Sequence, residues 1–201
     1  MDYALVEFSQ LDTDGINHLA ALHHSVMQTL LSDVGLPMVL RYYQVAQSDP
    51  SVIGICAIAP SGDMLGWALG SPHPDSINSH LRTPFSWFLF QMLRLTLTRP
   101  LILWQLISSV LGSSGQTDMK IGAIELTYIG VASHQRNKGL GGKLLDAFTE
   151  TSRLAGHHSV VLSVEMENAP AIALYEKAGF KIIQSFSEGR YKRHRMELIL
   201  R

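Results

Sequence analysis

A glycine-rich turn between an apolar strand and an amphipathic helix constrains this sequence most. The turn contains Gly139, Gly141 and Gly142. The residues before it, 121–132, are rich in β-branched and aromatic types and predict a strand, whereas the apolar residues from Gly139 to about Leu154 lie mostly on one helical face. The first turn of a helix has unpaired N–H groups and a partial positive charge, and glycines let an anion approach them closely. The junction therefore predicts a phosphate site.

Two common phosphate-binding motifs do not fit this turn. A P-loop requires Gly-Lys-Ser/Thr after four spacer residues, but Leu144 follows Gly142-Lys143. A dinucleotide-binding turn requires a third glycine three positions after the second, and Leu144 also occupies that position. The remaining pattern is Arg136-x-x-Gly139-x-Gly141 after a strand.

A second motif follows the turn at residues 167–180, ENAPAIALYEKAGF. Asn168 begins a predicted helix, and Tyr175 lies four residues before Gly179-Phe180. These two motifs, in this order, resemble the acetyl-CoA signatures of the GNAT superfamily of N-acetyltransferases, and the resemblance covers about residues 121–184. It implies the GNAT fold and acetyl-CoA as the acyl-donor substrate.

The other predicted elements are consistent with that fold. The length of 201 residues suits one α/β domain, 1–201, with a single mixed, mostly antiparallel central sheet flanked by helices. Helices are expected from Asp12 to about Leu31, at about 38–48, 139–154 and 168–177. Strands are expected at 3–8, 51–59, 63–70, 121–132, 159–164, 180–186 and 191–200.

A helical insertion at about 72–118 separates the third and fourth predicted strands. Its apolar residues do not predict a transmembrane span, because Arg94, Arg99 and Pro100 interrupt them, so two short helices are expected. Three interpretations are open: a helical flap over the substrate side or a homodimer contact, core packing, and contact with a membrane surface. The low share of charged residues, 16%, agrees with a less polar surface.

Composition narrows the classes of partner and location. The net charge of -1 argues against nucleic-acid binding. One cysteine, Cys56, allows no intrachain disulfide, and its apolar neighbours predict an inert core thiol. The N-terminus lacks signal-peptide features, so a cytoplasmic location is expected. No metal ligand set is expected.

The resemblance implies where acetyl-CoA binds. The backbone of Ile129, Gly130 and Val131 is expected to pair with the pantetheine arm between two splayed strands. Asn168 is expected to hydrogen-bond that arm, or to serve only as a helix N-cap. The diphosphate is expected to lie on the N–H groups of Gln135, Arg136, Asn137, Lys138, Gly139, Leu140, Gly141 and Gly142.

The resemblance also implies catalytic residues. Tyr175 is the expected general acid for the departing CoA sulfur, with simple packing as the alternative. Glu125 lies fourteen residues before Gly139, as does the catalytic glutamate of the family's histone acetyltransferases. It is the candidate base through water, on the strand face expected to carry Thr127, Ile129 and Val131, and a structural or substrate-positioning role is the alternative.

His23 and His24 are further candidates, either in the acceptor pocket or exposed to solvent. The expected function is transfer of an acetyl group from acetyl-CoA to a primary amine of a small molecule by direct attack. Acetylation of a protein or peptide amine and a non-catalytic acetyl-CoA sensor are the alternatives.

Overall fold

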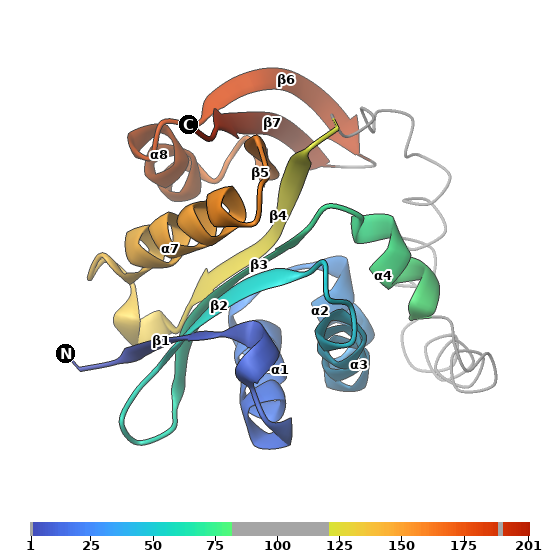
Figure 1. Cartoon of the computed structure of the whole chain (residues 1–201), viewed down its shortest axis with the longest axis vertical. Coiled ribbons are helices and arrows are strands. Elements are labelled where there is room, and N and C mark those ends of the chain that lie inside the picture. Colours follow the sequence, from blue (N-terminus) through green and yellow to red (C-terminus); the bar gives the residue numbers. More distant parts are fainter. Residues whose placement is uncertain (1, 82–120, 189–190) are drawn as a thin grey trace.

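One seven-stranded sheet organises the chain, and the computed structural model describes residues 2–81, 121–188 and 191–201 (Figure 1). The strand order is β1-β2-β3-β4-β5-β7-β6. Only β4 and β5 are parallel, and every other neighbouring pair is antiparallel, so the expected mixed sheet is confirmed. The strands are β1 (Ala4–Glu7), β2 (Ile53–Ile58), β3 (Met64–Ser71), β4 (Ala123–Val131), β5 (Ser159–Glu165), β6 (Lys181–Glu188) and β7 (Tyr191–Ile199).

Helices cover both faces of the sheet, as Figure 1 shows. One face carries the helices that follow β1 and β3, and the opposite face carries the helices that follow β4 and β5. We call these the α3 face and the α7 face. The α3 face has α1 (Thr13–Val26), α2 (Leu30–Val34), α3 (Leu36–Gln47) and α4 (Pro74–His80), and the α7 face has α7 (Leu140–Leu154) and α8 (Ala169–Lys177). Two 3-10 turns, η1 (Phe8–Gln10) and η2 (Ser133–Gln135), follow β1 and β4.

The expectation of one helix reaching about Leu31 is wrong. Asp12 caps α1 as predicted, with its side chain accepting from Gly15 N at 2.8 Å, but α1 ends at Val26. Thr29 then caps α2, because its hydroxyl accepts from Ser32 N at 3.3 Å. A hydroxyl that satisfies a helix-start N–H stabilises an extended residue at that point, so the helix is interrupted.

Each face of the sheet has its own hydrophobic core. On the α7 face, Leu144, Leu145 and Phe148 are fully buried against the strands. On the α3 face, Trp67 and Tyr43 are fully buried, and Cys56 lies among them. Burial raises the pKa of the Cys56 thiol to about 12, so the predicted inert core thiol agrees with the structure.

The parallel strands β4 and β5 pair over a short distance and then separate. Their register contains Ala123 opposite Ser159, Ile124 opposite Val160, and Glu125 opposite Val161. Beyond Glu125, β4 continues beside β3, and beyond Val161, β5 continues beside β7. We call the opening beyond these two residues the β4–β5 fork.

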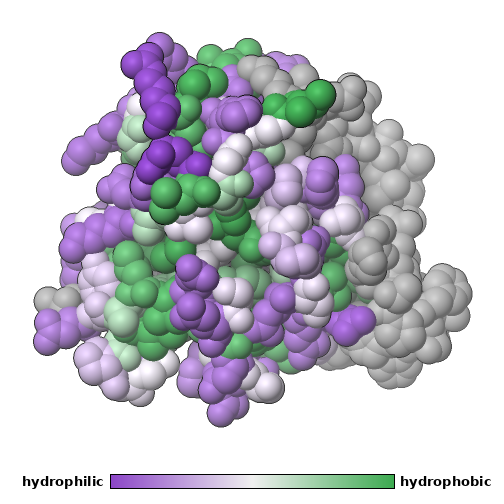
Figure 2. All heavy atoms as spheres, in the orientation of Figure 1, coloured by the Kyte–Doolittle hydropathy of each residue, from purple (hydrophilic) through white to green (hydrophobic). Residues whose placement is uncertain are grey.

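The segment between β3 and β4 is described only in part. It begins with α4, which packs beside α3, and residues 82–120 lie outside the described residues, as do the two apolar helices expected there. No helix in the described ranges is both long and apolar enough to cross a membrane. Hydrophobic and hydrophilic residues are interspersed over the described surface seen in Figure 2.

Candidate active site

The glycine turn, residues 135–142, leaves the start of α7 open. Gly139 is the N-cap of this 15-residue helix and makes no side-chain capping bond. Asn137 and Gly139 both adopt left-handed backbone, with φ of 61° and 82°, which glycine tolerates and asparagine adopts more readily than most residues. The N–H groups of the first turn thus meet no capping side chain, and Arg136 and Lys138 beside them are exposed. An uncapped helix start with basic residues beside it is the local geometry that the predicted anion site requires.

Internal packing does not require glycine at positions 141 and 142. A Cβ at Gly141 would lie 3.5 Å from Leu174 Cδ2 and 3.8 Å from Val131 Cγ2, and one at Gly142 would lie 3.9 Å from Leu174 Cδ1. These are ordinary van der Waals distances. Space that the protein leaves unused is the space that a closely approaching diphosphate would need. The same contacts show that the turn lies between the end of β4 and α8, so the two motifs meet in space.

The strand expected to bind the pantetheine arm borders the fork. Ile129 and Val131 pack against the core of the α7 face. Gly130 lies under the indole of Trp67, where a Cβ would come within 2.5 Å of a ring carbon. Beyond Glu125, no described strand pairs with the β4 edge that faces β5. The backbone of that edge is therefore available to an extended ligand, as the resemblance implied.

Asn168 and Tyr175 occupy the two ends of α8. The side chain of Asn168 accepts from Ala171 N at 3.3 Å, so its predicted role as N-cap is confirmed, and its bond to the cofactor arm stays a prediction. Tyr175 is buried, with its ring centroid 5.8 Å from that of Phe180. Burial raises the pKa of Tyr175 to about 12, so the phenol carries its proton near neutral pH. A protonated phenol is the form that a general acid requires.

Glu125 is held by a partner that sequence reasoning missed. Arg195 Nη1 donates to Glu125 Oε1 at 2.7 Å, and Nη2 donates to Oε2 at 3.0 Å. Arg195 Nη1 also donates to Ser163 Oγ at 3.0 Å. Because Arg195 lies 70 residues after Glu125, no local motif points to this contact. Both carboxylate oxygens of the candidate base are engaged.

The prediction that Glu125 lies on the same face of β4 as Ile129 and Val131 is wrong, because a β-bulge lies between them. The β3–β4 register passes from Gly70 opposite Leu126 to Leu69 opposite Tyr128, which leaves one extra residue on β4. Tyr128 accordingly joins the core of the α3 face, whereas Ile129 and Val131 face α7.

Glu125 lies on the α3 face, opposite Ile129 and Val131, because a bulge reverses the alternation of a strand. Burial raises the pKa of Tyr42 on α3, and the nearby Tyr128 and Glu125 raise it further. The tyrosine ring centroids of Tyr42 and Tyr128 are 5.4 Å apart. Tyr42, Tyr128 and Glu125 therefore form a polar cluster at the bulge, and its tyrosines were not among the predicted site residues.

His23 belongs to the core, while His24 is exposed. His23 Nδ1 lies 2.7 Å from the hydroxyl of Tyr43, and its ring centroid lies 4.7 Å from that of Tyr128. Burial, with a smaller effect of His24, lowers the pKa of His23 to about 4, so its imidazole is neutral near pH 7. The solvent-exposed interpretation is wrong for His23, because the side chain is fully buried against the rings of Tyr43, Trp67 and Tyr128. A part for either histidine in acceptor binding stays a prediction.

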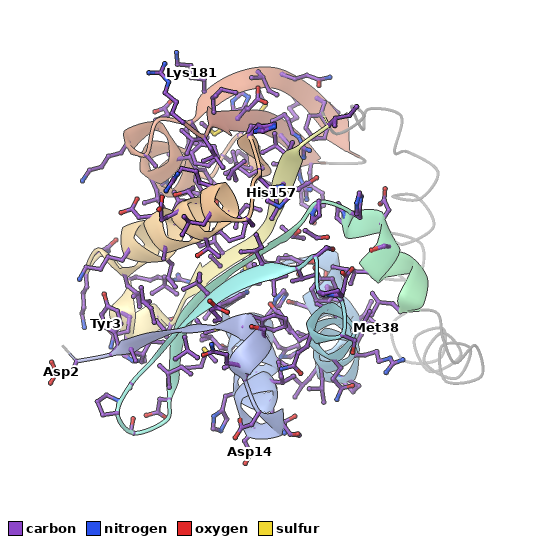
Figure 3. All side chains as sticks on the ribbon, viewed as in Figure 1. Asp2, Tyr3, Asp14, Met38, His157 and Lys181 are labelled. Carbon is purple, nitrogen blue, oxygen red and sulfur yellow. The ribbon has the colours of Figure 1, made fainter. Side chains whose placement is uncertain are left out.

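A shallow groove of about 640 Å³ lies beside the start of α7. Figure 3 shows Asp2 and Tyr3 at the N-terminal end of the chain, and Lys143 Nζ lies 5.4 Å from the Tyr3 ring centroid. The groove is lined by Asp2, Tyr3, Ala4, Val6, Ile58, Ala59, Pro60 and Lys143.

Within the described ranges, no group of three or more His, Cys, Asp or Glu residues could hold a metal ion.

Comparisons with known proteins point to one family of acetyltransferases. Residues 101–180 match the model of the acetyltransferase (GNAT) family. A stretch of 61 residues is 39% identical to mycothiol acetyltransferase of Corynebacterium glutamicum (strain R), covering 30% of this chain and 21% of that protein. A stretch of 52 residues is 44% identical to L-methionine sulfoximine/L-methionine sulfone acetyltransferase of Pseudomonas paraeruginosa, covering 26% of this chain and 30% of that protein.

A solved structure extends the likeness over the whole fold. The chain is similar to yncA from Salmonella typhimurium, determined with its cofactor acetyl-CoA, at a TM-score of 0.61 and 16% identity, covering 100% of this chain and 95% of that one. At this identity the likeness shows the fold. The chain spans less than a third of the length of the two curated relatives.

We predict that Gly141→Ala separates stability from ligand binding. The free energy of unfolding should be unchanged or rise by up to about 1 kcal/mol, because alanine favours a helix and its Cβ has room. Affinity for CoA, measured by calorimetry, should fall at least about tenfold, which equals about 1.4 kcal/mol. Thr149→Ala, in the same helix, is the control: it also gains helix propensity, and it should leave the affinity for CoA unchanged. Unchanged affinity in Gly141→Ala would place the diphosphate elsewhere.

A second prediction concerns the buried imidazole. The pKa of His23 is about 4 in the folded chain and 6.5 in the reference state, so unfolding takes up a proton between these values. The stability that this shift contributes is present above pH 6.5 and is lost as the pH falls toward 4, by roughly 3 kcal/mol in total. Denaturant unfolding from pH 7.5 to 4 should show a shallower slope for His23→Gln than for the wild type.

The exposed His18 on the same helix supplies the control for that experiment. His18→Gln should keep the slope of the wild type. Parallel pH profiles for His23→Gln and the wild type would contradict the neutral buried imidazole.

Proposed function

We propose that this chain, a member of the GNAT family of acetyltransferases, transfers an acetyl group from acetyl-CoA to a primary amine of a small molecule. One observation carries the proposal. The uncapped start of α7, with glycines at which a Cβ would make only ordinary contacts, lies next to the open edge of β4. A phosphate site continuous with an unpaired strand edge suits a ligand with a diphosphate at one end and an amide-containing arm at the other.

The donor would be held mainly by backbone groups. The N–H groups of the glycine turn would bind its diphosphate, and the backbone of Ile129 to Val131 would bind the arm. Asn168, at the end of the fork, would add a side-chain contact. Bound acetyl-CoA supplies the thioester carbonyl and the thiol leaving group. The fit supports the proposal because these contacts need no side chain that is already engaged.

Direct attack requires two proton movements. The amine nitrogen bonds to the thioester carbon and the carbon–sulfur bond breaks, so the nitrogen must lose a proton and the sulfur must gain one. Tyr175 is the proposed donor to sulfur, because its phenol stays protonated in the core of the α7 face. The polar cluster at the bulge lies on the other face of the sheet. The amine would then approach the fork from the α3 face, opposite the phenol, and its nitrogen would give its proton to water.

The proposed acceptor class is a small molecule with a primary amine. The names of the two relatives refer to small compounds, mycothiol and methionine sulfoximine or sulfone. The net charge of -1 gives no general attraction for a strongly charged protein tail.

A panel of amines tests this proposal. CoA release should be stimulated by at least one member of a set containing amino acids, amino sugars, polyamines and peptides. Turnover on peptides alone would favour the protein-acetylating alternative. Tight binding of acetyl-CoA without thiol release for any amine would favour a sensor, and no binding of acetyl-CoA would overturn the proposal.

The role of Tyr175 has its own prediction. Tyr175→Phe should keep the affinity for acetyl-CoA and lower kcat by about 10²-fold, since a positioned general acid contributes about 10²–10⁴. Phenylalanine retains the ring packing against Phe180, so stability provides the internal check. Tyr191→Phe is the matched control, because Tyr191 lies on β7 rather than on α8. An unchanged rate and pH profile in Tyr175→Phe would remove Tyr175 from the mechanism.

A further inference from the structure

The ion pair between Glu125 and Arg195 joins two strands that are not neighbours. Glu125 belongs to β4 and Arg195 to β7, and β5 lies between these strands in the sheet. The two oxygens of the carboxylate accept from two nitrogens of the guanidinium, at 2.7 and 3.0 Å. This two-pronged geometry restricts the relative orientation of both groups. The ion pair therefore forms a bridge across β5.

The bridge lies where the fork begins. Glu125 is the last β4 residue that pairs with β5, opposite Val161. Arg195 is opposite Ser163, two residues further along β5, and donates to its hydroxyl at 3.0 Å. The Arg195 guanidinium thus contacts Glu125 on β4 and Ser163 on β5. These contacts lie next to Glu125 and Val161, the last pair that joins the two strands.

Burial makes this bridge different from an ordinary surface ion pair. The side chains of Arg195 and Glu125 are 12% and 17% exposed. Glu150 and Arg153 on α7 form a similar two-pronged pair, but their side chains are 56% and 42% exposed. Water and salt screen the exposed pair, whereas the bridge is largely shielded from both. The bridge can therefore hold two strands at a constant offset.

We infer that Glu125 and Arg195 are positioning residues whose ion pair sets the width of the β4–β5 fork, and with it the fit of the acyl donor. This inference rests on the proposed function of the fork. A base accepts a proton on a carboxylate oxygen, directly or through water. Both oxygens of Glu125 already accept from Arg195, and a proton on either would remove the negative charge on which the ion pair depends. Of the two roles open to Glu125, positioning agrees with these contacts.

Three variants test the bridge: Glu125→Gln, Arg195→Met and the double variant. Each single change should weaken CoA binding, measured by calorimetry without any chemistry, by at least about tenfold, which equals about 1.4 kcal/mol. The pH profile of kcat should keep its shape. The double variant should lose less than the sum of the two single losses, because a single change leaves one charge in the site without its partner.

Glu150→Gln is the matched control, since it removes an ion pair of the same geometry outside the fork. It should bind CoA like the wild type. If a single variant does not fold, the double variant gives the comparison, because it retains neither charge.

Two results would overturn the inference. In the first, all three variants bind CoA as tightly as the wild type. In the second, Glu125→Gln loses rate only below the pKa of the acceptor amine while Arg195→Met resembles the wild type, which is the pattern of a base. A wild-type chain that does not bind CoA would overturn the proposed function itself, a result that the binding measurement separates from both.

Discussion

The separation of β4 from β5 is the constraint on which the rest of the site depends. In a continuous sheet the β4 edge would be hydrogen-bonded to β5 along its length, and nothing could enter between them. Here the pairing stops at Glu125 and Val161, and each strand keeps its other neighbour. The outer pairings keep the sheet intact while one interior edge stays open. The core of the α7 face closes one side of this opening, and Tyr175 belongs to that core.

The two faces of the sheet have different chemistry near the fork. The α7 face has a large apolar cluster, and Tyr175 contributes a phenol to it. The α3 face gathers Tyr42, Tyr128, Glu125 and Arg195 at the bulge. The β-bulge is what produces this contrast, because it turns Tyr128 toward α3 and Ile129 toward α7. A reaction that releases a sulfur on one side and admits an amine on the other can use such an asymmetry.

Local sequence features predicted the parts of the site that depend on local backbone. The glycine turn, the N-cap at Asn168 and the helix ending before Gly179 follow from short-range rules, and the structure has each of them. The mixed, mostly antiparallel sheet flanked by helices also followed, because the two motifs resembled those of a known fold. These features concern residues within one helical turn of each other, or a fold shared by many sequences.

The features that sequence reasoning missed are contacts between distant elements. Strand alternation placed Glu125 on the face of Ile129, because a bulge depends on the partner strand and leaves no pattern in β4 itself. Arg195 was missed for a similar reason, since its partner lies two strands away. His23 was assigned to the surface or to a pocket, because its helical position does not reveal that Trp67 and Tyr128 enclose it.

These missed contacts share a physical origin. Two polar groups on the α3 face have partners from other elements: Glu125 has Arg195, and His23 has Tyr43. Burying such groups without partners would be costly, so their arrangement is as specific as that of an apolar core. In the proposed site, the donor half would depend on backbone and can be inferred from the glycine turn. The proposed acceptor half would depend on polar side chains from β4, β7 and α3, and only the tertiary structure brings these together.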